Sequence, residues 1–177
     1  MDMLKALAQV EAVLPTLLAD DNWKDVDVDY HPPRVERLFR DWGEWRIYLH
    51  RIYPCLPEES LFHPHPWPSA MLLLSGEYQM CIGHGPGVDT PPIAERRIME
   101  TGSRYAMNDP DEWHSVAPIG SPVMSLMVTG PRWNRPSPKA TKIGVGSMPF
   151  SGNPQHIENL VKQVENARKQ YQNATER

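Results

Sequence analysis

Proline places the strongest constraint on what this chain can fold into. The chain has 19 prolines among 177 residues, about twice the usual share of roughly 5%. Because proline lacks a backbone N–H and its ring blocks the preceding helical turn, it interrupts helices and is confined to the ends and edges of strands. A helical bundle is therefore not expected, and short strands joined by proline-containing turns are expected instead.

Length and charge narrow the class further. A chain of 177 residues is about one domain and can bury a core without a disulfide or a metal. The net charge of −4 predicts no binding to nucleic acid or to an anionic membrane. The longest apolar run, Ala70–Leu74, is far shorter than the ~20 residues of a membrane span. No secretory signal follows Met1, so Cys55 and Cys81 are expected to be reduced thiols of a cytoplasmic protein, with a disulfide as the alternative.

One helix is expected near each end of the chain. In residues 1–29 apolar side chains recur every three or four positions, which predicts an amphipathic helix, kinked or divided at Pro15, and a linker. The stripe consists of Leu4, Leu7, Val10, Leu14, Leu17 and Leu18. Residues 134–177 are expected to form an irregular arm and then a helix, with Asn153 as N-cap and Pro154 at its first position. The stripe of this second helix is Ile157, Leu160, Val161, Val164 and Tyr171.

Residues 30–133 have the pattern of a β domain. Trp45–Tyr53 alternates apolar and polar side chains as a half-buried strand does. Two runs around Ser75 and Gly76, from Ser69 to Ile82, predict a hairpin with a tight turn. Further short runs bring the total to about eight strands, which favours a sandwich or barrel. These runs are Val35–Phe39, Ile93–Met99, Tyr105–Met107, Trp113–Val116 and Val123–Thr129.

The clearest chemical signal is a histidine pair in the sequence Phe62-His-Pro-His-Pro-Trp-Pro68. His63 and His65 lie two positions apart, so on an extended chain their side chains point to the same side. Each precedes a proline, which biases it away from the helical region. Neutral imidazole is the commonest metal ligand, and His114 follows a polar turn on a later strand. One interpretation is a proline-rich surface loop whose histidines have no function. The other is a metal site in which His63, His65 and His114 converge as ligands.

The stretch from Pro54 to Pro131 resembles the cupin superfamily. The matching residues are His63, His65 and Gly76 in the first cupin motif and Gly102, Pro110 and His114 in the second. The resemblance implies a mainly β fold, a cupin double-stranded β-helix (jelly-roll) barrel, here with an N-terminal and a C-terminal α-helix. It also implies that His63, His65 and His114 bind a metal.

Two departures from the cupin pattern bear on function. Ser69 stands where many cupins have a glutamate ligand, so the site is similar to that of three-histidine thiol dioxygenases, which use ferrous iron. Met127 and Thr129 stand where that family has a histidine and a tyrosine. The resemblance therefore favours a mononuclear non-haem iron dioxygenase acting on a small acidic or thiol substrate. A cupin binding or sensor module without catalysis and a metal-dependent isomerase or hydrolase are the alternatives.

The same residues and the same resemblance predict which metal is bound and which side chains surround it. Fe(II) is favoured by resemblance, and zinc, nickel, manganese or copper are alternatives for a nitrogen-rich site. The expected substrate-binding residues are Ser69, Trp67, Glu112, Met127 and Arg46. Arg46 shares a strand face with Tyr48 and His50; it would bind a carboxylate if that face lined the interior, although the outside is slightly favoured. By analogy, a homodimer is expected, formed through an edge strand or the arm.

Overall fold

The computed structural model describes residues 2–86, 89–134 and 152–175. Its helices and strands, in chain order, are α1 (Met3–Leu18), β1 (Lys24–Asp25), β2 (Val35–Trp42), β3 (Trp45–Ile52), β4 (His63–Pro64), β5 (Ser69–Ser75), β6 (Glu77–His84), β7 (Ile93–Glu100), β8 (Arg104–Met107), β9 (Glu112–Pro118), β10 (Val123–Thr129) and α2 (Pro154–Thr175). Among the described residues, no helix combines the length and apolar character needed to cross a membrane.

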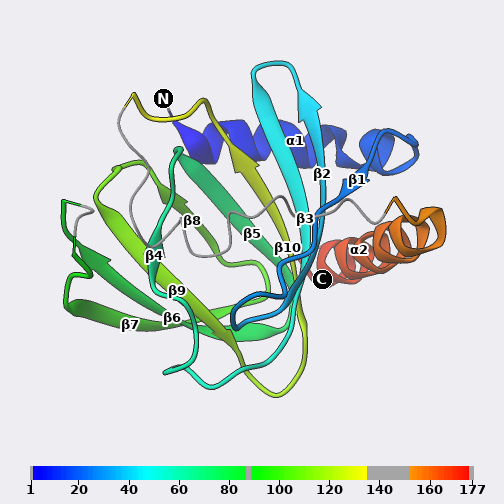
Figure 1. Ribbon diagram of the computed structural model, residues 1–177. Helices are drawn as coiled ribbons and strands as arrows, with labels where there is room; N and C mark the ends of the chain where they lie inside the picture. Colours follow the sequence, from blue (N-terminus) through cyan, green and yellow to red (C-terminus); the bar gives the residue numbers. More distant parts are fainter. Residues whose placement is uncertain (1, 87–88, 135–151, 176–177) are drawn as a thin grey trace.

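The strands form two antiparallel sheets, shown in Figure 1 with both helices on the outer side of the larger sheet. The larger sheet has the order β1-β2-β3-β10-β5-β8, and the smaller has the order β4-β9-β6-β7. From β3 onward the chain crosses to the other sheet at every step except between the paired strands β6 and β7, in the manner of a jelly roll. The predicted mainly β jelly roll with two terminal helices is confirmed. No described strand pairs across the two sheets, so the roll is an open sandwich and not a closed barrel.

The predicted hairpin around Gly76 is wrong. β5 pairs with β10 and β8, whereas β6 pairs with β7 and β9, so the chain crosses from one sheet to the other between them. Gly76 has a φ of +81°, and a Cβ there would lie 3.0 Å from Val123 Cγ2. The turn signal was therefore real, but it marks a corner between the sheets because both strands find other partners.

The N-terminal helix packs against the outer face of the larger sheet. Asp2 caps it by accepting a hydrogen bond from the Lys5 backbone N–H at 3.2 Å. Pro15 lies inside a single continuous helix and does not divide it. The predicted stripe is buried apart from Leu4, which is 44% exposed, and Met3 is buried in addition.

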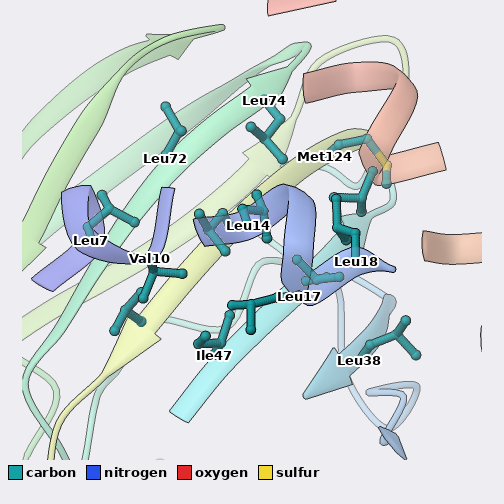
Figure 2. Close-up of a cluster of buried hydrophobic side chains, with 14 of the residues drawn as sticks. Leu7, Val10, Leu14, Leu17, Leu18, Leu38, Ile47, Leu72, Leu74 and Met124 are labelled. Atoms are coloured by element: carbon teal, nitrogen blue, oxygen red, sulfur yellow. The ribbon is translucent and has the colours of Figure 1, made fainter. Parts of the chain in front are cut away.

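The main apolar core lies between this sheet face and the two helices (Figure 2). The strands contribute large aliphatic side chains, among them Leu38, Ile47, Leu49, Leu72, Leu126 and Val128. Leu160 and Val164 of α2 are buried in the same cluster. The predicted N-cap is confirmed, because Asn153 Oδ1 accepts hydrogen bonds from the backbone N–H groups of Gln155 and His156. The arm predicted before Asn153 falls largely at 135–151, outside the described residues.

Candidate metal centre

Two strands of the smaller sheet bring the three histidines together. In the antiparallel pairing of β4 with β9, His63 lies directly opposite His114. The ring centroids are 5.0 Å apart for this pair, 5.3 Å for His63 and His65, and 4.7 Å for His65 and His114. One ligand nitrogen from each ring lies within 4.8 Å of the others. The three residues singled out by the sequence are therefore neighbours in space, although 49 positions separate His65 from His114.

Hydrogen bonds on the outer ring nitrogen orient two of these imidazoles, those of His63 and His65. His63 Nδ1 lies 2.9 Å from the Leu61 carbonyl oxygen, which can only accept, so Nδ1 carries the proton and the Nε2 lone pair is left for a ligand role. His65 Nδ1 lies 3.0 Å from the Ser69 hydroxyl. Partners of this kind on the outer ring nitrogen are typical of metal-bound histidines. Ser69 thus supports His65, and its role as a substrate contact stays a prediction.

Burial keeps the three rings neutral. It lowers the pKa of His63 to about 4, and the pKa values of His65 and His114 lie well below the usual range, first because of burial and then because the neighbouring imidazoles repel a second charge. Neutral imidazole is the form that binds metals. The site is therefore in its ligand form at neutral pH.

The donor set fits a divalent ion. His65 Nε2 and His114 Nε2 are 3.0 Å apart, close to the roughly 3 Å expected for two nitrogens at right angles around an ion at about 2.1 Å. His114 Nδ1 is buried without a partner in the described part of the chain. The three imidazoles could hold an ion on one side and leave its other positions open.

The inner face of the larger sheet brings polar residues toward this cluster. Arg37, His50 and Ser125 are aligned across β2, β3 and β10. His50 is buried, its Nδ1 lies 3.3 Å from Ser125 Oγ, and its pKa is lowered to about 3 by burial and then by the charge of Arg37. The charges of His50 and Arg37 also lower the pKa of His65. Sequence analysis missed Arg37 because nothing in its strand distinguishes an inner arginine from an outer one.

The predicted outside placement of Tyr48 and His50 is therefore wrong. Both are buried, and their rings stack at a centroid distance of 5.9 Å. Their neighbours Ile47 and Leu49 face the helices, so strand alternation puts Tyr48 and His50 on the inner face. The sequence correctly predicted that Tyr48 and His50 share one face of the strand. It could not show that this face is the inner one, because that depends on which face of the sheet the helices cover.

Arg46 lies near the end of the same face and already has an acid partner. Its Nε donates to Asp41 Oδ1 at 2.7 Å, and its guanidinium carbon lies 4.9 Å from the Phe39 ring centroid. Its side chain is exposed, in agreement with the outside placement that the sequence slightly favoured. Of the two arginines on this face, Arg37 is the one that faces the sandwich interior.

The three remaining predicted substrate contacts lie in different surroundings. Glu112 Oε2 accepts a hydrogen bond from the Asp109 backbone N–H at 3.0 Å, so it closes the turn before β9. Met127 is buried in an inner apolar cluster with Phe39, Tyr48 and Met71. Trp67 lies beside the histidines, with its ring centroid 6.3 Å from that of His65.

No protein-family model matches the chain, and comparison with curated proteins finds no match. Solved structures with a similar fold include the hydroxypropylphosphonic acid epoxidase of S. wedmorenis, at 16% identity and a TM-score of 0.47 over 62% of this chain and 56% of that one. AerE from Microcystis aeruginosa has 16% identity and a TM-score of 0.47 over 66% and 51% of the two chains. KdgF from Halomonas sp. has 11% identity and a TM-score of 0.46 over 60% and 88%. The match thus spans little more than half of the epoxidase, and none of these activities is carried over to this chain.

Proposed function

We propose that this protein is a metal-dependent enzyme whose three-histidine centre binds Fe(II) and oxidises a small acidic or thiol substrate with dioxygen. The observation that carries the proposal is the convergence of one ligand nitrogen from each of His63, His65 and His114. Ferrous iron in such a site supplies open coordination positions and the capacity to activate dioxygen. Three protein ligands leave at least one further position of the ion open for substrate.

The chemistry of the ligands favours an anionic substrate. Three neutral imidazoles leave the double positive charge of the ion uncancelled, so a thiolate or carboxylate is attracted to it. A second cation lies across the sandwich at Arg37. Its Nε donates to the Val26 carbonyl oxygen at 3.1 Å, and within the described residues its guanidinium forms no ion pair. We assign Arg37 to the anionic group of the substrate, which a guanidinium can bind through two parallel hydrogen bonds.

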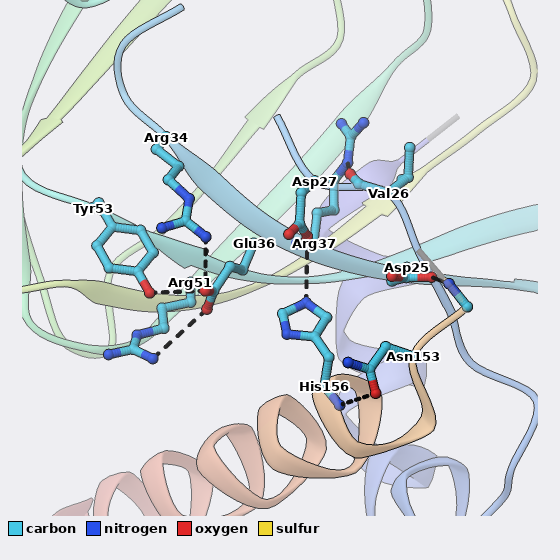
Figure 3. A network of polar contacts seen from close by, with 11 residues as sticks. Asp25, Val26, Asp27, Arg34, Glu36, Arg37, Arg51, Tyr53, Asn153 and His156 are labelled. Atoms are coloured by element: carbon cyan, nitrogen blue, oxygen red, sulfur yellow. Dashed lines mark hydrogen bonds and ion pairs between the residues drawn. The ribbon is translucent and has the colours of Figure 1, made fainter. Parts of the chain in front are cut away.

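Arg37 is held in place from outside the sandwich. Asp27 Oδ1 accepts a hydrogen bond from the Arg37 backbone N–H at 3.0 Å and lies 3.5 Å from His156 Nε2 at the start of α2 (Figure 3). The Arg37 guanidinium carbon also lies 5.4 Å from the Tyr48 ring centroid. The bond to Asp27 fixes the Arg37 backbone, and the contacts with Val26 and Tyr48 restrict the rotamers of its side chain, which lowers the entropy lost when it binds an anion.

The first test is metal content. Protein purified without chelators is expected to carry about one divalent ion per chain, and His63→Ala combined with His65→Ala is expected to abolish binding. His84→Ala is the matched control, because His84 is exposed and pairs with Asp109 away from the cluster. Equal metal content in the double variant and the control would refute the centre.

The second test is turnover. Fe(II)-loaded protein is expected to consume oxygen with at least one member of a panel of thiols, β-diketones and phenolic acids. Turnover under anaerobic conditions would instead identify an isomerase or hydrolase. Thermal stabilisation by a ligand without oxygen uptake or turnover would identify a binding module.

A further inference from the structure

One buried donor near the metal centre has no acceptor. Trp67 Nε1 is buried, and no residue in the described ranges accepts its hydrogen bond. Such a group loses its hydration on folding and gains nothing in return, so native proteins rarely keep one without a use. The indole N–H of Trp67 is therefore free to donate to something that the folded chain does not itself supply.

Other tryptophans of this chain are satisfied by the backbone. Trp23 Nε1 donates to the Leu17 carbonyl oxygen at 2.9 Å, and Trp113 Nε1 donates to the Gly85 carbonyl oxygen at 3.2 Å. Both of these indoles are almost fully buried. Burial alone therefore does not explain why the N–H of Trp67 lacks a partner.

The position of Trp67 directs attention to the metal centre. It follows His65 by two residues, and the two ring centroids are 6.3 Å apart. Backbone hydrogen bonds fix the segment on both sides, from Trp133 N to Pro66 O at 3.0 Å and from Gly130 N to Pro68 O at 2.9 Å. The Arg132 guanidinium carbon lies 5.4 Å from the centroid of the Trp67 ring. The backbone on both sides of Trp67 is thus fixed, and its ring lies beside that of His65.

We propose that the Trp67 indole N–H donates a hydrogen bond to an oxygen of the ligand bound at the three-histidine centre. This inference rests on the proposed function and narrows its substrate class. The substrate carries a metal-binding atom and, a short distance from it, a carboxylate or carbonyl oxygen. A site built around such a donor discriminates against ligands that lack the oxygen, because the N–H is then left unpaired.

The test uses the full chain loaded with cobalt(II) and two thiols of similar size. Thioglycolate has a carboxylate next to its thiol, whereas ethanethiol has none. Binding is followed by the thiolate-to-cobalt absorption in the unaltered protein, in Trp67→Phe and in Trp113→Phe. We expect Trp67→Phe to weaken thioglycolate binding about tenfold and to leave ethanethiol binding unchanged, while Trp113→Phe changes neither.

Thermal stability gives an independent measurement, in which Trp113→Phe is expected to have the larger effect and Trp67→Phe the smaller. Trp113→Phe removes the donor to a backbone carbonyl and is expected to lower the melting temperature of the ligand-free protein. Trp67→Phe removes a donor that has no partner and is expected to lower it less. An unchanged thioglycolate affinity in Trp67→Phe, or an equal loss for both thiols, would overturn the role of Trp67 while leaving the metal centre intact. Failure of the unaltered protein to bind cobalt would overturn the metal centre and this inference together.

Discussion

The two faces of the larger sheet differ in kind although they share the same strands. Along β3, Ile47 and Leu49 face the helices, and Tyr48 and His50 face the smaller sheet. Leu49 and His50 are adjacent in the chain and are 0% and 5% exposed. The helix-covered face buries aliphatic side chains, which stabilise the fold. The inner face buries imidazole and guanidinium groups whose desolvation opposes folding, and it faces the candidate site.

We therefore expect the helix-covered face to determine the stability of the fold and the inner face to determine ligand binding. Removing apolar volume from the helix-covered face is expected to change the free energy of unfolding and to leave ligand binding alone. Changing polar groups on the inner face is expected to affect ligand binding and the pH dependence of stability more than stability at neutral pH. The predictions below test this division.

The largest effect is expected for Leu126→Ala on β10. Leu126 is fully buried against the helices, so its truncation should lower the free energy of unfolding by about 2–5 kcal/mol. Denaturant unfolding measures the loss, and metal content measured at a temperature where the variant is folded should be unchanged. The adjacent inner-face variant Met127→Leu is the control, with a cost under about 1.5 kcal/mol. A loss of metal in Leu126→Ala alone would contradict the division of the two faces.

Acid is expected to destabilise the metal-free protein through its buried imidazoles. The pKa of His50 is about 3 in the folded protein, against 6.5 as its ordinary value. The unfolded chain therefore binds one more proton at this residue as the pH falls from 6.5 toward 3, and the stability present above pH 6.5 is lost over that range. His50→Gln should reduce the slope of unfolding free energy against pH by about 1 kcal/mol per unit.

Urea titrations at several pH values between 4.5 and 7 measure this slope. His84→Gln is the control, because the pKa of this exposed imidazole is raised by its hydrogen bond with Asp109, and its removal should not flatten the slope. Parallel slopes for the unaltered protein and His50→Gln would mean that His50 is not held neutral by its surroundings.

A smaller effect in free energy is expected for Arg37→Met. The variant replaces a half-buried cation by an apolar side chain of similar length, so stability should change little or rise. Thioglycolate affinity of the cobalt protein should fall about tenfold, as expected for the loss of one charge-assisted hydrogen bond. Arg46→Met is the matched control, because Arg46 pairs with Asp41. Equal affinities in the two variants would remove Arg37 from the site.

The smallest effect is expected on the solvent side of α2. Lys169 Nζ lies 2.8 Å from Glu165 Oε1 in an exposed i,i+4 pair. Lys169→Ala should lower the free energy of unfolding by about 0.2–0.5 kcal/mol, and less at high salt. A loss above about 1 kcal/mol would show that this face of the helix has a structural role beyond the ion pair.

Much of the metal centre could be predicted from local sequence. His63 and His65 each precede proline, so their extended conformation and their common side follow from the steric restrictions of two neighbouring residues. His114 was singled out because it follows a polar turn on a later strand, and the resemblance supported it. The pairing of β4 with β9 places it opposite His63. Ser69 was predicted as a substrate contact, whereas its hydrogen bond with His65 became visible only in the fold, because a hydroxyl near two imidazoles can contact either the ligand or the ring.

The order of residues along this chain determined the short proline-bounded strands, the two amphipathic helices, the presence of a turn at Gly76 and the direction of paired side chains. It could not determine which face of a strand is inside, because alternation defines two faces and only helix packing distinguishes them. Arg37 and Arg46 lie on the same face of the sheet, and nothing in the sequence distinguishes them. Only the folded sheet separates the arginine that faces the imidazoles from the one that meets Asp41 near the surface.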